Sequence, residues 1–311
     1  MMKKISILIP CYNEEENVVA ISRAVEEELK SSCPQYDYEL CFIDNCSVDN
    51  TRPLIREICR RNPKVKAIFN ARNFGQFNSP YYGITQLDGD CVISLCADFQ
   101  DPVEMIPQIV AEWEKGAKIV SCIKTQSDED WFVRLLRTLY YKIIYRMSEV
   151  EQIEHFTGFG LYDKSFVEVL RNLHDPSPFL RGIVAELGFK RVSLPYRQAR
   201  RRAGKSHNDW YSLFDAAMLS FTSYTKAGMR FATIGGFIAS FGSLCVAIFY
   251  LVKKLRHWAT MSLGLAPLII GVFFLGSLQL FFIGFLGEYI MSINKRIMNR
   301  PLVIEEERIN W

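Results

Sequence analysis

An acidic cluster follows an apolar run in the first third of the chain. The run at 91–95 leads into Cys96-Ala97-Asp98-Phe99-Gln100-Asp101, and Pro102 comes next. The apolar run is typical of a buried strand, and carboxylate and amide oxygens at its end are the hard ligands that divalent metals prefer. Sites of this kind usually open with a carboxylate, whereas Cys96 takes that position here. The motif therefore predicts metal-assisted chemistry, or a scaffold that has kept the site and lost the reaction.

Polar residues also follow three other apolar runs. They are Tyr12, Asn13 and Glu14 after the first run, Asp44, Asn45 and Ser47 after the second, and Arg72 and Asn73 after the third. Each cluster alone is more simply a turn, because Asn, Asp, Gly and Pro are ordinary turn residues. Four clusters at the same point relative to a strand favour a shared site.

Short β-rich runs alternate with longer amphipathic runs around these clusters. We expect strands at 5–9, 38–44, 65–69 and 91–96, with helices at 15–31 and 51–61 and after the later strands. This alternation predicts an α/β fold with a mostly parallel sheet covered on both faces by helices. Ligands of such sheets bind outside the carboxyl ends of the strands, so the four clusters should meet at one edge.

Two long uncharged runs lie near the C-terminal end, at 231–252 and 261–287. Each exceeds the ~20 residues that a helix needs to span a bilayer, so we expect a hairpin of two transmembrane helices. The loop between them carries Lys253, Lys254 and Arg256, which the positive-inside rule would keep in the cytoplasm. Re-entrant helices that do not cross the membrane are therefore the alternative.

The N-terminal sequence MMKKISILIPCYNEEEN is too short in its apolar part for a signal peptide and lacks a small-residue cleavage site. The first part of the chain is therefore expected in the cytoplasm, and two spans would return the tail to the same side. The nine cysteines are odd in number and form no CxxC pair, which suits a reducing compartment and argues against a zinc site.

The net charge is only +3, but basic residues cluster ahead of the first uncharged run, at Arg197, Arg200, Arg201, Arg202 and Lys205. Such a cluster suits phosphates or anionic lipid headgroups, and a solvated face near a membrane is the simpler alternative. Residues 131–147 and 209–230 are typical of amphipathic helices at a membrane surface. A core-packed helix fits 131–147 equally well. No nucleic acid partner is expected.

Several short motifs are distributed along the chain, from its first residues to its last. They are residues 6–14, Asp44 with Ser47, Asp49 and Thr51, and then 72–75, 97–102, 179–182, 196–197, 204–206, 286–290 and 300–302. Together they resemble the family-two glycosyltransferases that charge polyprenyl phosphate with a sugar, the group of bactoprenol glucosyltransferases and dolichyl-phosphate mannose synthases. The resemblance covers nearly the whole chain.

This resemblance implies a cytoplasmic GT-A (Rossmann-like) domain at 1–208 and a juxtamembrane helix at 209–230. Two transmembrane helices at 231–290 and a cytoplasmic tail at 291–311 would follow. It implies inverting transfer of a sugar from a nucleotide sugar, with UDP favoured, to polyprenyl (undecaprenyl) phosphate. The protein would be a multi-pass protein of the inner membrane, and the reaction would take place at the cytoplasmic face of that membrane. Its lipid-linked sugar would serve the modification of cell-envelope glycans.

Carried over by position, the resemblance assigns nucleotide-sugar binding to Pro10, Tyr12, Glu14, Asp44, Asn73 and Asp98. Mg²⁺ or Mn²⁺ would be held by Asp98 and Gln100. The acceptor phosphate would be bound by Lys124, Arg134, Arg197, Arg201 and Lys205, and catalysis would fall to Asp98, Arg201 and Lys205. A divalent ion stabilises the charge on a leaving phosphate. An acceptor phosphate is already an anion near neutral pH, so it requires positioning more than deprotonation.

Three positions depart from the pattern of this family. Cys96 replaces the first carboxylate of a DADLQD-like motif, Asn45 replaces the second carboxylate of a DDGS-like motif, and residues 157–160 read TGFG in place of a GDFR-like stretch. These changes indicate a different sugar or a weaker metal site. Cys96 as a nucleophile is a further reading, although a buried strand-end thiol is generally inert.

Two other functions remain open. A catalytically inactive, nucleotide-binding membrane scaffold would explain Cys96. A scaffold, however, needs only one of the two clusters, whereas this chain has both the donor-side and the acceptor-side cluster. A processive polysaccharide synthase usually has more membrane helices and a QxxRW-like motif. We also expect the extended residues 302–304 after Pro301 to pair with a neighbouring sheet edge, which would allow a homo-oligomer.

Overall fold

The computed structural model describes residues 2–126, 153, 155–199, 201–202, 234–238, 265–298 and 300–311, with single positions at 241, 242, 245, 248, 252 and 256. An eight-stranded sheet of order β7-β5-β6-β4-β1-β2-β3-β8 forms its centre. The strands are β1 (Lys4–Cys11), β2 (Asp37–Asp44), β3 (Val65–Asn70), β4 (Cys91–Ser94), β5 (Ile119–Gln126), β6 (Phe156–Asp163), β7 (Arg191–Arg197) and β8 (Glu305–Ile309).

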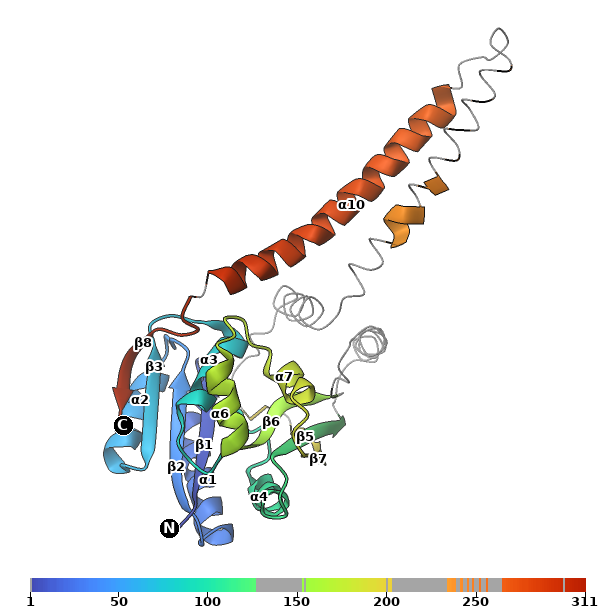
Figure 1. Ribbon diagram of the computed structural model, residues 1–311. Coiled ribbons are helices and arrows are strands. Elements are labelled where there is room, and N and C mark those ends of the chain that lie inside the picture. The colour runs from blue at the N-terminus through green and yellow to red at the C-terminus, as the bar shows by residue number, and fades with distance from the viewer. Residues whose placement is uncertain are drawn as a thin grey trace.

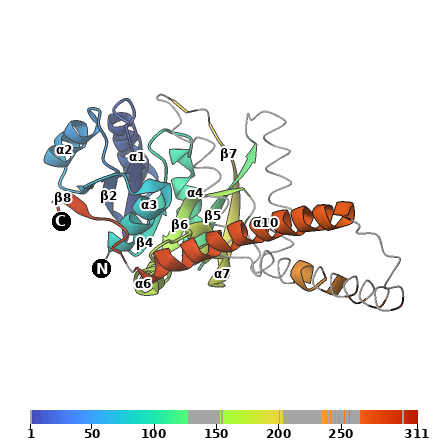
Figure 2. The same ribbon diagram turned by 90° about the horizontal axis from the view of Figure 1, so that it is seen from above.

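Helices cover both faces of this sheet (Figures 1 and 2). They are α1 (Val18–Ser32), α2 (Thr51–Arg61), α3 (Gly75–Gln86), the short η1 (Val103–Met105) with α4 (Ile106–Glu114), α6 (Lys164–Leu173) and α7 (Leu180–Glu186). A long helix, α10 (Leu265–Ile297), projects from the sheet domain (Figure 1). The α/β architecture predicted from the sequence is therefore confirmed.

The sheet has two halves of different construction. In the parallel half, β4, β1, β2 and β3 all run in one direction. In the mixed half, β6 is antiparallel to both β4 and β5, and β5 is parallel to β7. Strands β1 to β5 and β7 thus share one direction, and β6 and β8 run against it. Six carboxyl ends consequently lie at the same edge of the sheet.

Alternation along the strands sends side chains into two separate cores. Ile5, Ile7 and Ile9 of β1 pack on the face covered by α1, α2 and α4, while Leu8 packs on the face covered by α3 and α6. Because β1 is buried on both faces, it reads as a continuous apolar run, as central parallel strands do. The helix α1 presents its apolar residues at helical spacing, at Val18, Ile21, Val25 and Leu29.

One glycine is required by close strand pairing. Gly160 in β6 has φ +156, and a Cβ on it would lie 2.1 Å from the backbone oxygen of Val120 in β5. No side chain fits at 160 in this arrangement. Gly160, the last residue of the TGFG stretch that departs from the GDFR-like pattern, is therefore required by the pairing of β5 with β6.

The prediction that Cys96 lies at the end of a buried strand is wrong. The sequence predicted a strand that reaches residue 96, but β4 ends at Ser94 and Cys96 is exposed. Cys41 and Cys91, which lie in the strands expected at 38–44 and 91–96, are both buried. The chain leaves the sheet early because the loop that starts here is fixed by its own hydrogen bonds, described below.

Within the described residues, one helix is long and apolar enough to cross a membrane. The candidate span is Phe274–Asn294 in α10, and large apolar side chains cover its surface, including Phe274, Leu280, Ile283 and Ile290. Of the other predicted span, 231–252, the structure describes 234–238 and the single positions 241, 242, 245, 248 and 252, all of them helical. The amphipathic helices predicted at 131–147 and 209–230 lie wholly outside the described residues.

The chain beyond α10 returns to the sheet. β8 pairs antiparallel with β3 of the same chain, with Ile309 opposite Ala67 and Glu307 opposite Phe69, and Figure 1 shows it along the outer edge of the parallel half. The prediction that residues 302–304 pair with a neighbouring edge is corrected in two respects. The paired segment is 305–309, and its partner is this chain's own β3.

Candidate active site

The loops at the carboxyl edge of the parallel half are joined to one another. The backbone N–H of Asn13, after β1, donates to Ser47 Oγ after β2 at 2.8 Å, and the N–H of Val48 donates back to Asn13 Oδ1 at 2.9 Å. Asn13 (φ 54°), Cys46 (φ 66°) and Phe99 (φ 61°) follow three neighbouring strands in the left-handed region. Non-glycine residues rarely adopt that conformation, and it concentrates at functional sites.

Glu14 is a buried carboxylate in the first of these loops. Its backbone N–H donates to Thr51 Oγ1 at 2.8 Å, and its Oε2 accepts from Asn17 Nδ2 at 2.7 Å. Burial raises the pKa of Glu14, while Asn17 and the charge of Arg201 oppose that rise and the charge of Asp98 adds to it. The loop therefore holds an anion whose charge depends on a nearby cation.

Asp44 ends β2 and is completely buried. Its Oδ2 accepts from Arg52 Nε at 2.6 Å and from the N–H of Ser47 at 3.1 Å. Its other oxygen, Oδ1, is buried and has no hydrogen-bond partner among the described residues. An unsatisfied buried carboxylate oxygen is costly, so it indicates an acceptor position for a ligand N–H or O–H.

Asn45 joins the second and third loops. Its Nδ2 donates to Asn73 Oδ1 at 2.8 Å, and its Oδ1 accepts from Asn70 Nδ2 at 3.1 Å and from the N–H of Phe74 at 2.9 Å. An aspartate at position 45 would have no N–H group to donate to Asn73 Oδ1. The amide in place of the family's second acid therefore has a structural explanation in this network.

The fourth loop is held by two aspartates with different roles. Asp101 is buried, and it accepts from the N–H of Cys96 at 2.9 Å and from Tyr196 Oη at 3.1 Å. Among the described residues, the Asp98 side chain accepts a local bond from the N–H of Gln100, at 3.1 Å on Oδ1, and its Oδ2 lies 3.7 Å from Arg201 Nη1. Asp101 thus shapes the loop, and Asp98 offers an oxygen for other partners.

The Cys96 thiol is not set up as a nucleophile. Although its side chain is exposed, desolvation by the surrounding protein raises the pKa of the thiol, and the carboxylates of Asp101 and Asp98 raise it further. The thiolate is the reactive form of cysteine. Anionic neighbours therefore keep Cys96 protonated near neutral pH.

Arg201 connects the donor-side carboxylates. Its guanidinium forms a close ion pair with Glu14 Oε1 and lies 3.7 Å from Asp98 Oδ2. The backbone supports this position, because the N–H of Arg202 donates to the backbone oxygen of Asp98 at 3.2 Å. The basic cluster after β7 therefore reaches the carboxyl edge of the parallel half, more than 180 residues away from Glu14 in sequence (201 minus 14 is 187).

The remaining predicted site residues are placed as follows. Pro10 is the next-to-last residue of β1 and Tyr12 directly follows the strand, both half-buried, and Asn73 lies in the third loop. Lys124 and Arg197 lie near the carboxyl ends of neighbouring strands β5 and β7. Arg134 and Lys205 lie outside the described residues. The structure thus gathers the predicted donor residues and brings one predicted acceptor residue, Arg201, into contact with them.

Comparison with known proteins agrees with this arrangement. The model of glycosyl transferase family 2 matches residues 6–183. The chain belongs to this family. A bactoprenol glucosyl transferase of Shigella phage SfV is 32% identical over 312 residues, covering 98% of this chain and 99% of that protein. An SfII prophage-derived bactoprenol glucosyl transferase of Shigella flexneri is also 32% identical, over 97% of both chains.

Family 2 membership makes the protein a glycosyltransferase, and its fold is that of solved relatives. A mannosyltransferase from Pyrobaculum calidifontis, solved with GDP-Man and Mn²⁺, superposes with a TM-score of 0.51. It is 14% identical, and the match covers 96% of this chain and 88% of that one. At this identity the likeness shows the GT-A fold alone.

The donor set of this glycosyltransferase suits a divalent ion that brings other ligands with it. The described residues contain no group of three His, Cys, Asp or Glu side chains that would enclose a metal. Asp98 Oδ2 and the amide oxygen of Gln100 are hard ligands in neighbouring positions. Mg²⁺ is commonly held by one or two carboxylates together with phosphates of the substrate. The residues present therefore fit a shared metal site better than a closed one.

Two residues of this site escaped the sequence analysis, because Arg52 holds Asp44 and Asn17 holds Glu14. Asp101 was placed in the acidic cluster without a role of its own, and it fixes the 96–101 loop through the hydroxyl of Tyr196. Arg52 lies in a helix that reads as amphipathic and solvated, so nothing local distinguishes it. Tyr196 was noticed only as part of a motif. The roles of Arg52 and Tyr196 follow from their proximity to Asp44 and Asp101 in the folded chain. A single sequence does not contain that information.

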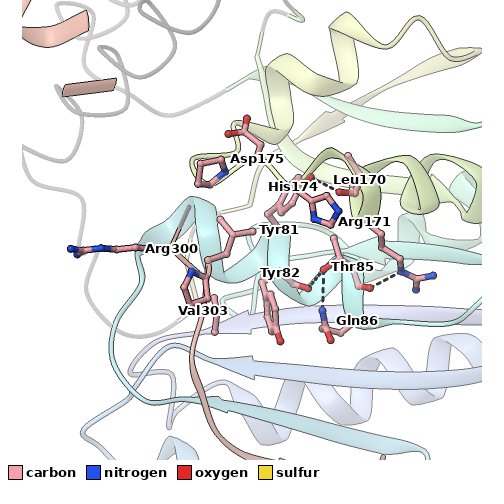
Figure 3. Close-up of a pocket in the computed structure, with 13 residues that line it drawn as sticks. Tyr81, Tyr82, Thr85, Gln86, Leu170, Arg171, His174, Asp175, Arg300 and Val303 are labelled. Carbon is pink, nitrogen blue, oxygen red and sulfur yellow. Dashed lines mark hydrogen bonds between the residues drawn. The ribbon is translucent and has the colours of Figure 1, made fainter. Parts of the chain in front are cut away.

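A cavity of about 520 Å³ lies away from this site, between α3, the end of α6 and the segment that follows α10. Figure 3 shows Tyr81, Arg171 and Thr85 around it. Its polar groups are committed to backbone bonds: Tyr81 Oη donates to Leu170 O at 2.9 Å and Arg171 Nε donates to Thr85 O at 2.7 Å. The cavity contains none of the predicted site residues.

Proposed function

We propose that this glycosyltransferase transfers a sugar from a nucleotide sugar to polyprenyl phosphate, with inversion, at the cytoplasmic face of the membrane. The observation that carries the proposal is the contact of Arg201 with both Glu14 and Asp98. A cation from the acceptor-side cluster lies directly against the donor-side carboxylates. Full-length similarity to bactoprenol glucosyl transferases supports the lipid acceptor.

The donor side suits a nucleoside diphosphate. The unsatisfied Asp44 Oδ1 is an acceptor for an N–H of the base, which both uracil and guanine offer, and Tyr12 lies close by for contact with the nucleoside. UDP is the favoured nucleotide from the family resemblance. Asp98 and Gln100 would hold Mg²⁺ or Mn²⁺, and such an ion supplies charge stabilisation to the leaving phosphate.

The acceptor side suits a phosphate monoester. Arg201, with Lys124 and Arg197 on the neighbouring strand ends, is positioned to bind and orient its oxygens. Arginine matches phosphate through parallel N–H bonds. An oriented phosphate oxygen attacks the anomeric carbon from the face opposite the leaving diphosphate, which inverts the centre. Because the acceptor arrives as an anion, no side chain has to remove a proton.

The path of the chain supports a membrane segment that begins and ends on one side. β7 and β8 belong to the same sheet, so the chain leaves it after residue 197 and rejoins it at residue 305 on the same side of a bilayer. Helix α10, at 33 residues, is about 50 Å long and exceeds the ~30 Å of a hydrocarbon core. An even number of crossings follows if α10 spans the membrane, as in the predicted hairpin.

A direct assay tests the proposal. The purified full-length protein in detergent is incubated with undecaprenyl phosphate, a panel of UDP- and GDP-sugars, and either Mn²⁺ or EDTA, and lipid products are identified by mass spectrometry. We expect one donor to yield a lipid-linked monosaccharide in the presence of metal. No product from any donor would favour the inactive scaffold, and product unaffected by EDTA would contradict the metal role of Asp98.

A further inference from the structure

The side chain of Arg52 in α2 makes three contacts that join three parts of the chain. Its Nε donates to Asp44 Oδ2 at 2.6 Å, its Nη2 donates to the backbone oxygen of Asn70 at 2.5 Å, and its Nη1 pairs with Glu306 Oε2 at 2.8 Å. Asp44 ends β2, Asn70 ends β3, and Glu306 belongs to β8. The last strand of the chain thereby contacts the group that holds the buried carboxylate.

A second ion pair joins the same two elements without reaching the site. Arg56, one turn further along α2, pairs with Glu307 Oε2 at 2.7 Å, and both guanidinium groups lie over the ring of Phe69. The Arg56 and Glu307 side chains are 34% and 39% exposed. Both pairs join α2 to β8, and Arg52 is the member of the two that contacts Asp44.

We propose that Glu306 is a positioning residue for the donor site, which holds Arg52 against Asp44 and thereby sets the affinity for the donor nucleotide. This inference rests on the proposed function, because it takes Asp44 to bind the nucleoside. It adds that β8, encoded after the membrane helix, completes the donor site from outside the region matched by the family model, residues 6–183.

Electrostatics explain why Glu306 matters to a carboxylate it does not contact. Asp44 is fully buried, and its charge is balanced by the Arg52 guanidinium, which is 15% exposed. The Arg52 side chain has several rotatable bonds, and three acceptors at fixed positions select one rotamer. Without the charge at 306, the bond from Arg52 Nη1 is no longer charge-assisted, so this rotamer of the guanidinium is held less firmly. Asp44 then becomes less well oriented to present Oδ1 to a ligand.

Matched variants of the full-length protein in detergent separate positioning from stability. Glu306→Gln and Glu307→Gln each remove one charge from β8, and we expect similar small decreases in melting temperature. Binding of UDP and GDP is measured by calorimetry with Mn²⁺ present. For the nucleotide that binds the wild type, Glu306→Gln should weaken affinity about threefold, as expected for a partly exposed ion pair, and Glu307→Gln should leave it unchanged.

Lysine variants extend the comparison. Arg52→Lys keeps the charge, but one ammonium cannot contact all three acceptors, so affinity should fall about tenfold, while Arg56→Lys should retain wild-type affinity. Equal affinities for Glu306→Gln and Glu307→Gln, or losses that simply follow the melting temperature, would overturn the inference. A wild-type protein that binds neither nucleotide would instead contradict the proposed function on which it rests.

Discussion

The parallel and mixed halves of the sheet contribute to the candidate site in different ways. In the parallel half, the loops after β1, β2 and β3 are bonded to one another, which fixes Glu14 and Asp44, and the loop after β4 is held by Asp101. The mixed half supplies cations from the ends of β5 and the partly exposed β7. The proposed donor side is thus preorganised, and Arg201 of the proposed acceptor side lies against its carboxylates.

Arg201 shows what this difference means for binding. Two carboxylates of the opposite half, Glu14 and Asp98, lie against its guanidinium. A phosphate that binds Arg201 must therefore compete with Glu14 and Asp98 for the same guanidinium.

The largest expected effect comes from removing the charge of Asp98 in the parallel half. Asp98→Asn should reduce turnover about 100-fold or more, because stabilisation of the leaving diphosphate is lost. Its melting temperature should stay near that of the wild type, since the Asp98 side chain makes a local hydrogen bond with Gln100 and a loose contact with Arg201 in the part of the chain that is described. Steady-state assays with the active donor and thermal unfolding check both parts. Substantial remaining activity would contradict the site assignment.

Replacing the cation of the mixed half should have the next largest effect. Arg201→Gln is expected to lower kcat/KM for polyprenyl phosphate about 10- to 100-fold, with nucleotide affinity retained. Arg202→Gln is the matched control, because its guanidinium lies over the Phe99 ring and makes no ion pair with Glu14 or Asp98 among the described residues. Equal losses in both variants would indicate a general effect of positive charge.

A buried ion cluster within the parallel half affects stability more than activity. Glu39 accepts from Ser6 and pairs with Lys66 at 2.8 Å and Lys4 at 3.2 Å. Burial opposes the charge of Glu39, but Lys66, Ser6 and Lys4 outweigh it and lower its pKa below 4.5. Glu39→Gln should therefore reduce the free energy of unfolding by about 2 kcal/mol at pH 7.

The sign of this pH dependence is fixed by the lowered pKa. The stabilising contribution of Glu39 is fully present above pH 4.5 and is lost as pH falls through the folded-state value. The difference between wild type and Glu39→Gln, measured by urea unfolding, should close below pH 4.5. A difference that stays constant down to pH 3 would contradict the role of the charge.

The smallest effect is expected where the two halves meet at Cys96. Cys96→Ser should change turnover by no more than about twofold, because the thiol is held protonated and contacts no donor-side anion that needs it. Initial rates with the active donor measure this. A loss comparable to that of Asp98→Asn would support a nucleophilic role for Cys96, which the structure argues against.

The sequence predicted the parallel half well and the mixed half poorly, for a physical reason. The strands β1 to β4 are buried on both faces, so their apolar runs and the polar turns that follow are visible in order. β7 alternates and is partly exposed, β6 runs antiparallel, and β8 is a charged strand of five residues. Their partners are distant in sequence, so only the folded chain reveals them. Arg52 was missed, and the bond of Asp101 to Tyr196 was not foreseen, for the same reason.

The late position of β8 has a consequence for how the protein is made. β3 ends at residue 70 and β8 begins at 305, a separation of 235 positions. During synthesis the outer edge of β3 therefore stays bare until α10 has been translated. Bare strand edges pair readily with other chains, and long-range strand pairing is slow. The nascent domain is thus most exposed to aggregation while α10 is being synthesised, and closure of the sheet by β8 marks the end of that interval.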